Sequence, residues 1–356
     1  MTHGSPELDA DAEKLLALGV DPGPTLADLD LEPPALSPFL PCTNIQFAWD
    51  STCLGLLKTC PRLYQYTMID GWSSRDQSIH LRFGIEYHTA LQQYEVSRAN
   101  GVSHEDSIHT TVKETMVRTA DWHPDTSTKA GKYKNRECLV RLVVDYLDHY
   151  GPNDPAQTYI KADGQPAVEL SFRFELEYGP KTLDEFNLEV HDPGQPYLLC
   201  GHLDRVVTFN DALLVLDHKT TTTTLGSYYF DQWEPNNQMT LYTLAGRVVL
   251  SVPIRGIVIS AAQILLEEPN RFVRGFTYRT PDQLDEWMQD LSTLLRINET
   301  YATANHWPMN DTACDKFGGC KFRGICSKSP SVREKFLRAD FIKLPEAERW
   351  NPLRSR

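Results

Sequence analysis

Two short segments of the sequence contain residues suited to metal-dependent chemistry. One reads GHLDR and contains Asp204, and the other reads LVLDHK and ends in Asp217, His218 and Lys219. Side chains alternate along a strand, so Asp217 and Lys219 would share one face. Carboxylates converging at two adjacent strand ends are typical ligands of Mg²⁺ or Mn²⁺, and a lysine beside the ion can steady an attacking water or the charge growing on a phosphate. The alternative is that Asp204 forms an ordinary ion pair with Arg205 or Lys219.

Other segments supply further polar side chains for such a site. Gln238 and Tyr242 are four residues apart in a predicted helix and would share one face. His88 lies in a helical segment after Gly84, a residue at which we expect another backbone to approach closely. Glu169 lies in the strand-like sequence VELSFRFEL. Each also has an ordinary interpretation: His88 as a satisfied helix histidine, and Glu169 as an exposed strand acid.

The cysteines fall into two kinds. Cys138 and Cys200 lie in apolar stretches and are predicted to be buried. The run CDKFGGCKFRGIC instead places Cys314, Cys320 and Cys326 at regular spacing in a Gly- and Lys-rich loop. Such thiols are poor core residues and good metal ligands, and a fourth ligand must come from elsewhere in the chain. We do not expect a disulfide framework in a protein of this size and expected location.

Periodicity divides the chain into a helical first third and a mixed α/β core. Helices are predicted at 44–66, 80–99, 105–122 and 135–150, and the first of them is expected to end near Cys60-Pro61. The core is predicted to contain strands at 167–177, 196–203, 205–210, 212–219, 254–266 and 271–278, with helices at 236–249 and 281–305. Asn210-Asp211 is a candidate hairpin turn. The predicted organisation is an acidic arm (1–40), a helical region (41–155), a mixed α/β core (156–311), a cysteine loop (312–328) and a basic tail (329–356).

The net charge of −13 argues, taken alone, against a polyanionic partner. It is unevenly distributed: residues 1–40 contribute −7 and residues 312–356 contribute +6. Lys129, Lys132, Tyr133, Lys134 and Arg136 form a basic loop that could contact a nucleic-acid strand, with Tyr133 as a stacking platform. A solvated linker is the equal alternative for this loop. The sequence shows neither a membrane-spanning apolar run nor a secretory signal, so we expect a cytoplasmic protein with no membrane partner.

Taken together, these segments resemble the PD-(D/E)XK nuclease superfamily, and most closely its RecB-like exonuclease branch. That branch includes the AddB nuclease domain, the CRISPR spacer-acquisition exonuclease and phage-encoded relatives. The resemblance covers about residues 45–328, and seven ordered pieces carry it: Leu57–Tyr64 with Cys-Pro-Arg-x-Tyr, Gly84-x3-His88, Glu169, Gly201-x2-Asp204-Arg205, Asp217-x-Lys219, Gln238-x3-Tyr242, and the three late cysteines. Two departures are that Leu203 replaces the proline of the family name, and that the first spacing of the late cysteines is longer than in most CRISPR relatives.

The resemblance implies a restriction-endonuclease-like mixed central sheet flanked by helices. It also implies roles for individual residues. Asp204, Asp217, the backbone carbonyl of His218 and His88 would ligate Mg²⁺ or Mn²⁺, and Lys219 would orient the water and stabilise the phosphorane-like charge. Gln238 and Tyr242 would position substrate or Lys219, and Glu169 would support the metal or a neighbouring group.

The same resemblance implies that Cys60 joins Cys314, Cys320 and Cys326 around a [4Fe–4S] cluster that links the two ends of the chain. Cys42 and Cys53 are rival fourth ligands, and a four-cysteine structural Zn²⁺ site is the alternative cofactor. Such a cluster would close the long loop between Cys60 and Cys314, so its loss should destabilise the whole protein.

The function expected from this resemblance is metal-dependent DNA hydrolysis at single-stranded ends, in recombination, repair or phage DNA processing. Two other classes are a DNA-end-binding or assembly protein that does not cleave, and a redox or regulatory iron–sulfur protein. Protein partners could bind through the acidic arm or the basic tail, and a homo-oligomer is compatible with the sequence. If the protein is phage-encoded, its location would be the host cytoplasm.

Overall fold

The structure is a computed structural model that describes residues 37–75, 78–183, 189–191, 195–250, 252–316 and 319–354. Most of the predicted acidic arm, residues 1–36, lies outside the described residues. The last residues of that predicted segment belong to the folded body, because Leu40 is buried and Phe39 bridges to Gln46.

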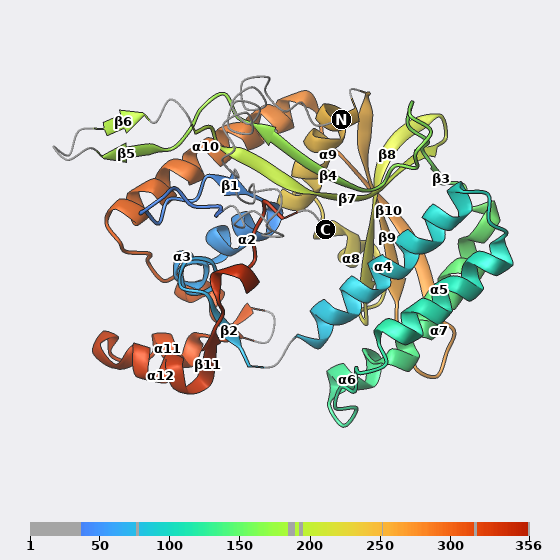
Figure 1. The fold of residues 1–356 in the computed structure, drawn as a ribbon, viewed down its shortest axis with the longest axis horizontal. Coiled ribbons are helices and arrows are strands. Elements are labelled where there is room, and N and C mark those ends of the chain that lie inside the picture. The colour runs from blue at the N-terminus through green and yellow to red at the C-terminus, as the bar shows by residue number, and fades with distance from the viewer. Residues whose placement is uncertain are drawn as a thin grey trace, which may run out of the picture. The chain divides into compact units, whose positions relative to one another are not determined.

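A mixed seven-stranded sheet forms the centre of the described protein (Figure 1). Its main path runs β1-β7-β8-β9-β10, and β3 and β4 pair with the long strand β7 as well. The strands are β1 (Ala48–Trp49), β3 (Gln157–Thr158), β4 (Val168–Glu175), β7 (Leu198–Phe209), β8 (Ala212–Thr221), β9 (Ile254–Gln263) and β10 (Arg271–Tyr278). Two small sheets pair β2 (Trp72–Ser74) with β11 (Phe341–Lys343), and β5 (Lys181–Leu183) with β6 (Glu189–His191).

Helices cover both faces of this sheet. The helices are α2 (Ser51–Thr59), α3 (Pro61–Tyr64), α4 (Ile79–Ala99), α5 (His104–Arg118), α6 (Lys129–Tyr133), α7 (Arg136–Tyr150), α8 (Ser227–Asp231), α9 (Asn237–Leu250), α10 (Pro281–Thr303), α11 (Arg323–Cys326) and α12 (Arg333–Asp340). The main core joins α2, α9 and α10 to inward side chains of β7, β8 and β9. A second core joins α4 and α7 to the end of β9 (Figure 1). The predicted mixed sheet flanked by helices is therefore confirmed.

Most predicted elements are confirmed, with two corrections at boundaries. The predicted strands 196–203 and 205–210 are one continuous strand, β7, because it pairs with β4 from Leu198 to Arg205 and with β8 from Arg205 to Phe209. The helix predicted at 44–66 begins only at Ser51, where the Asp50 side chain accepts a hydrogen bond from the Cys53 amide. Its predicted end near Cys60-Pro61 is confirmed, because α2 ends at Thr59 and Cys60 has an extended backbone before Pro61.

The predicted hairpin turn is confirmed. Asn210 and Asp211 connect β7 and β8 with φ angles of 47° and 58°. Two consecutive residues with positive φ are typical of the tight turns that match strand twist, and Asn and Asp tolerate that region best among residues with a Cβ. The turn fixes the register that places Arg205 opposite Leu216.

The segment predicted as a basic tail is folded through residue 354. Strand β11 pairs with β2, and the Leu344 amide donates to the carbonyl of Gly71. Leu337 and Phe341 pack with Tyr66, Trp72 and Phe322 in a separate small core. Figure 1 shows α11, α12 and β11 beside α3 and β2, so the end of the described chain packs against its beginning.

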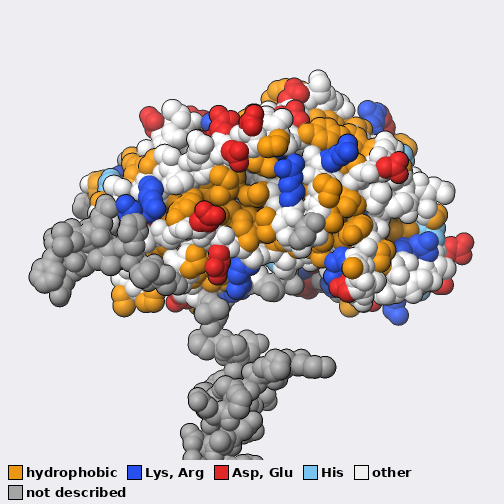
Figure 2. All heavy atoms as spheres, turned by 90° about the horizontal axis from the view of Figure 1, so that it is seen from above, with side chains coloured by type: hydrophobic (Ala, Val, Ile, Leu, Met, Phe, Trp, Pro, Cys, Tyr) orange, Lys and Arg blue, Asp and Glu red, His pale blue; other side chains and the backbone are white. Residues whose placement is uncertain are grey.

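The surface includes apolar regions as well as charged ones. Figure 2 shows one face on which hydrophobic side chains gather near the centre, with basic and acidic side chains scattered around them. Among the described residues, no helix has the length and apolar character that crossing a membrane requires.

Candidate active site

Asp204 and Asp217 lie where β7 and β8 separate. The ladder between these strands runs from Phe209–Ala212 to Arg205–Leu216, and the two aspartates come next on either side. Beyond that point β8 stays paired with β9 as far as Thr221, whereas β7 stays paired with β4. The Asp204 carboxylate lies in the resulting gap and accepts a hydrogen bond from the His218 amide at 2.9 Å. The prediction of two strand ends is thus wrong in detail, because both residues lie inside strands that diverge.

Strand β4 brings a third carboxylate to the same row. Val168 pairs with Arg205 and Leu170 with Leu203, so Glu169 lies opposite Asp204. Glu169 has a φ of 47°, a left-handed conformation that costs free energy for a residue with a Cβ. One ligand atom each from His88, Glu169 and Asp204 lie within 4.8 Å of one another. Sequence reasoning gave Glu169 the least specific role, but the structure places it directly in the site.

Helix α4 supplies the imidazole. His88 Nδ1 lies 3.1 Å from Asp204 Oδ2, and its Nε2 lies 2.9 Å from the carbonyl oxygen of His218. Burial disfavours the imidazolium, but the Asp204 carboxylate outweighs that effect and raises the pKa of His88 above 6.5. The predicted group of His88, Asp204 and the His218 carbonyl is therefore brought together.

Lys219 connects β8 with α9. Its Nζ lies 2.6 Å from Asp217 Oδ2 and donates to Gln238 Oε1 at 3.1 Å. The Gln238 amide in turn donates to the Tyr242 hydroxyl at 3.1 Å, which confirms that the two residues share one face of α9. The ammonium thus has a fixed position beside the carboxylate row.

The electrostatics of the site favour a bound cation. Burial raises the pKa of Asp217, and the nearby Asp204 carboxylate adds to that effect. Burial acts in the same direction on Asp204, but the His88 imidazole outweighs it and holds the pKa of Asp204 below its usual range. Carboxylate oxygens, a carbonyl and an imidazole make a donor set that fits Mg²⁺ or Mn²⁺. The chemistry of these residues therefore fits a divalent ion.

Arg205 does not pair with Asp204, which removes one ordinary explanation of the motif. Its guanidinium is buried and lies 3.0 Å from Glu95 and 3.4 Å from Asp154. Asp154 also binds Arg274, with contacts of 2.5 and 2.7 Å. These ion pairs join α4, which carries Glu95, to strands β7 and β10, which carry Arg205 and Arg274.

A cleft of about 230 Å³ opens onto this row. Its lining includes His88, Asp204, Asp217, Lys219, Gln238 and Tyr242, and also Asp50 and Trp350, which sequence reasoning missed. Nothing in the spacing of Asp50 and Trp350 links them, because only the folding of the C-terminal segment brings them together.

Two glycines shape the cleft in different ways. Gly84 lines it, and an added Cβ there would meet no heavy atom within 4 Å, so the predicted close approach of a backbone is wrong. At Gly201 a Cβ would lie 2.6 Å from the Phe172 ring, so β4 and β7 can pack this closely only with glycine.

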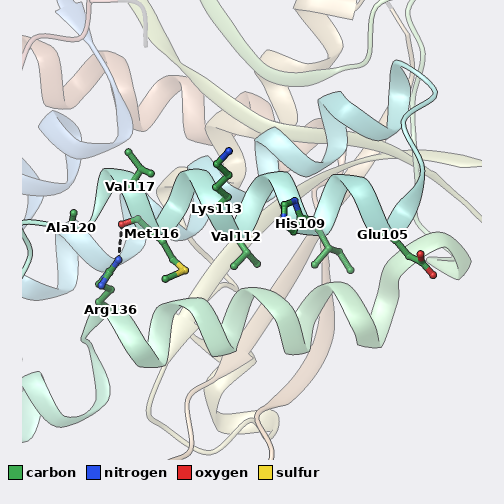
Figure 3. A pocket seen from close by; sticks show the side chains of 9 residues that line it. Glu105, His109, Val112, Lys113, Met116, Val117, Ala120 and Arg136 are labelled. Atoms are coloured by element: carbon green, nitrogen blue, oxygen red, sulfur yellow. Dashed lines mark hydrogen bonds between the residues drawn. The ribbon is translucent and has the colours of Figure 1, made fainter.

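A larger apolar groove of about 900 Å³ lies between α5 and α7 (Figure 3). Val112 and Met116 line it, and Arg136 closes one end by donating to the Met116 carbonyl at 2.8 Å. Arg136 is the one predicted site residue in its lining. The groove is therefore separate from the carboxylate row.

The predicted basic loop is a short helix, α6, followed by the start of α7. Its five candidate DNA-contacting residues are Lys129, Lys132, Tyr133, Lys134 and Arg136. Lys129 and Lys132 are exposed. Tyr133 packs against the second core, and Lys134 is buried over the Phe83 ring, donating to Thr220 at 3.1 Å. The prediction that Lys134 contacts DNA at the surface is wrong, because its side chain is buried between Phe83 on α4 and Thr220 on β8.

Cys60 lies near the three late cysteines, Cys314, Cys320 and Cys326. Cys314 interacts electrostatically with Cys320 and Cys60, and so does Cys326. Cys60 also accepts a hydrogen bond from the Asn310 amide at 3.3 Å. Of the rival ligands, Cys53 lies in the main core and Cys42 is exposed. Cys138 and Cys200 are buried, as predicted.

Comparison with known proteins identifies the family. The profile of the PD-(D/E)XK nuclease superfamily matches residues 52–327. The chain belongs to this superfamily. PD-(D/E)XK nucleases hydrolyse phosphodiester bonds with divalent metals, and the candidate metal site of this nuclease lies within the matched range.

A solved structure gives a more distant likeness. The crystal structure of a "Putative exonuclease" from Eubacterium rectale superimposes with a TM-score of 0.42 and 10% identity, over 76% of this chain and 86% of that one. A search of curated protein sequences finds no match.

Proposed function

We propose that this PD-(D/E)XK nuclease is a metal-dependent DNA exonuclease that acts at single-stranded ends. The observation that carries the metal-dependent hydrolysis is the row of Glu169, Asp204 and Asp217 across three neighbouring strands, with His88 and Lys219 beside it. Asp204, Asp217, His88 and the carbonyl of His218 would hold Mg²⁺ or Mn²⁺, and Glu169 would complete or support that set. A bound divalent ion would activate water and neutralise charge on the scissile phosphate.

Lys219 is proposed to orient the attacking water and to stabilise the charge that develops on the phosphate oxygens. A lysine side chain is flexible, so its placement needs support. Asp217 and Gln238 hold the ammonium from two sides, at 2.6 and 3.1 Å. Tyr242 fixes the Gln238 amide, and so it acts on Lys219 indirectly.

We also propose that Cys60, Cys314, Cys320 and Cys326 hold a [4Fe–4S] cluster. Four cysteine thiolates are the ligand set of such a cluster. Cys314 and Cys326 each interact with Cys60 and Cys320, so the early cysteine lies with the late three. Arg62 and Arg333 interact with Cys326 and would offset the negative charge of the thiolates.

The test of the proposed function is digestion of end-labelled single- and double-stranded DNA by anaerobically purified protein with Mg²⁺ or Mn²⁺. We expect progressive shortening of the single strand, and no shortening by Asp217→Ala, which should still bind DNA. Binding without digestion by the wild type, under every metal condition, would replace this proposal with a DNA-end-binding protein. Cleavage of closed circular single strands would show that ends are not required.

A further inference from the structure

Trp350 lies at the edge of the catalytic cleft although it belongs to the last described segment. It lines the same cleft as Asp204, Asp217 and Lys219. Trp350 is 39% exposed, which makes it the most exposed of the seven tryptophans, five of which are buried. An exposed aromatic surface beside a catalytic site needs an explanation beyond packing.

The position of the indole is fixed from two sides. Its Nε1 donates to Asp50 Oδ2 at 2.7 Å. Asp50 is itself buried, and its other oxygen accepts from the Cys53 amide at 2.8 Å at the start of α2. The preceding residue, Arg349, donates to the Ile69 carbonyl at 3.0 Å. The ring is therefore held in place at its edge while part of its surface stays open to solvent.

A second hollow, of about 330 Å³, continues the cleft. Gly201 and His202 line both hollows. Beyond them the lining includes Arg173 on β4 and Arg354 in the C-terminal segment, both exposed. Arg173 also donates to the Leu353 carbonyl at 2.7 Å, which joins the two walls. Along these two hollows the lining therefore changes from Trp350 and the proposed metal site to Arg173 and Arg354.

We propose that Trp350 is a stacking platform for a nucleobase next to the scissile phosphate, with Arg173 and Arg354 contacting the neighbouring phosphates. This proposal rests on the proposed nuclease function and defines its substrate as a strand with unpaired, unstacked bases. An aromatic ring can stack on any base, whereas a base inside a duplex has both faces covered by its neighbours. Trp350 would therefore select single-stranded ends without selecting sequence.

The test compares Trp350→Leu, which keeps apolar bulk, with Trp350→Phe, which keeps an aromatic face. Tyr278→Leu removes a 55%-exposed aromatic that lines a different pocket, on β10, and is the matched control. Binding of a fluorescein-labelled oligothymidine is measured by anisotropy in EDTA, so that cleavage does not interfere. A series of oligonucleotides with one abasic site, moved stepwise along the strand, locates the stacked base. Melting temperatures show whether each variant is folded.

We expect Trp350→Leu to weaken binding about tenfold, and Trp350→Phe and Tyr278→Leu to stay within about threefold of the wild type. One abasic position should weaken binding by the wild type, and that effect should disappear in Trp350→Leu. Equal binding by wild type and Trp350→Leu, or an equal loss in the leucine and phenylalanine variants, would overturn the platform. If the wild type neither binds nor cleaves DNA, the proposed function itself fails, which is a different result.

Discussion

Glu169 on β4 faces Asp204 on β7, and Glu169 adopts a left-handed backbone conformation in doing so. Strain of this kind persists where the surrounding structure over-determines it, and it clusters at functional sites. Here it accompanies a group of three side chains whose ligand atoms lie within 4.8 Å of one another. This relationship supports the proposed role of Glu169 in the metal site.

Removing charge from this row should therefore reduce metal binding in a graded way. We expect Asp204→Asn to abolish cleavage and to weaken Mn²⁺ binding at least tenfold, and Glu169→Gln to have a smaller effect on both. Glu175→Gln, an exposed change on the same strand, is the control and should bind Mn²⁺ as the wild type does. Calorimetric titration with Mn²⁺ measures the affinities, and unchanged affinity in Asp204→Asn would contradict the site.

Metal affinity should rise with pH. The pKa values of His88 and Asp217 are both raised, the first by the Asp204 carboxylate against the effect of burial, the second by burial and by Asp204. Each group must lose its proton to act as a ligand, so protons compete with the metal below these pKa values. We expect the apparent Mn²⁺ dissociation constant to fall between about pH 5 and pH 8. Asp217→Asn should show a shallower dependence, and a flat profile in the wild type would exclude these ligands.

Lys219 should contribute to the rate of hydrolysis more than to DNA affinity. We expect Lys219→Met to lower the cleavage rate by about 10²- to 10³-fold, with DNA binding in EDTA little changed, because its charge acts on the transition state. Gln238→Ala should lower the rate less, since Asp217 still holds the ammonium. Single-turnover cleavage measures both. Equal losses of rate and affinity in Lys219→Met would instead indicate a role in substrate binding.

The cysteine site should control colour and stability together. We expect the anaerobically purified protein to be brown, and Cys320→Ala or Cys60→Ala to lose the visible absorption and to melt at a lower temperature. Cys42→Ala, at an exposed position, is the control and should change neither. A colourless protein with one equivalent of Zn²⁺ would replace the cluster with a zinc site, and retention of colour by Cys60→Ala would point to another fourth ligand.

The buried Lys134 should lower the free energy of unfolding at neutral pH. Burial lowers the pKa of Lys134 to about 8, while in the unfolded chain it is about 10.4. Between these values the unfolded state binds more protons, so the stability of the wild type rises with pH there. We expect Lys134→Met to be more stable at pH 7 by about 1–3 kcal/mol, an advantage that shrinks as the pH approaches 10. Chemical denaturation at several pH values tests this, with the exposed Lys132→Met as the control.

The sequence alone determined the elements and most of the chemistry. Strand alternation placed Asp217 and Lys219 on one face, helical spacing placed Gln238 and Tyr242 on one face, and the hairpin turn at Asn210-Asp211 set the register of β7 and β8. These features depend on residues close together in the chain, so local periodicity is enough to predict them.

Tertiary structure alone decided which distant residues meet. The divergence of β7 and β8 opens the gap that Asp204 fills, a left-handed residue brings Glu169 into the row, and burial takes Lys134 away from solvent. Trp350 reaches the cleft because the C-terminal segment folds back on α2 and β2, where Asp50 receives its indole N–H. Such contacts depend on packing across the whole chain, and no spacing within the sequence encodes them.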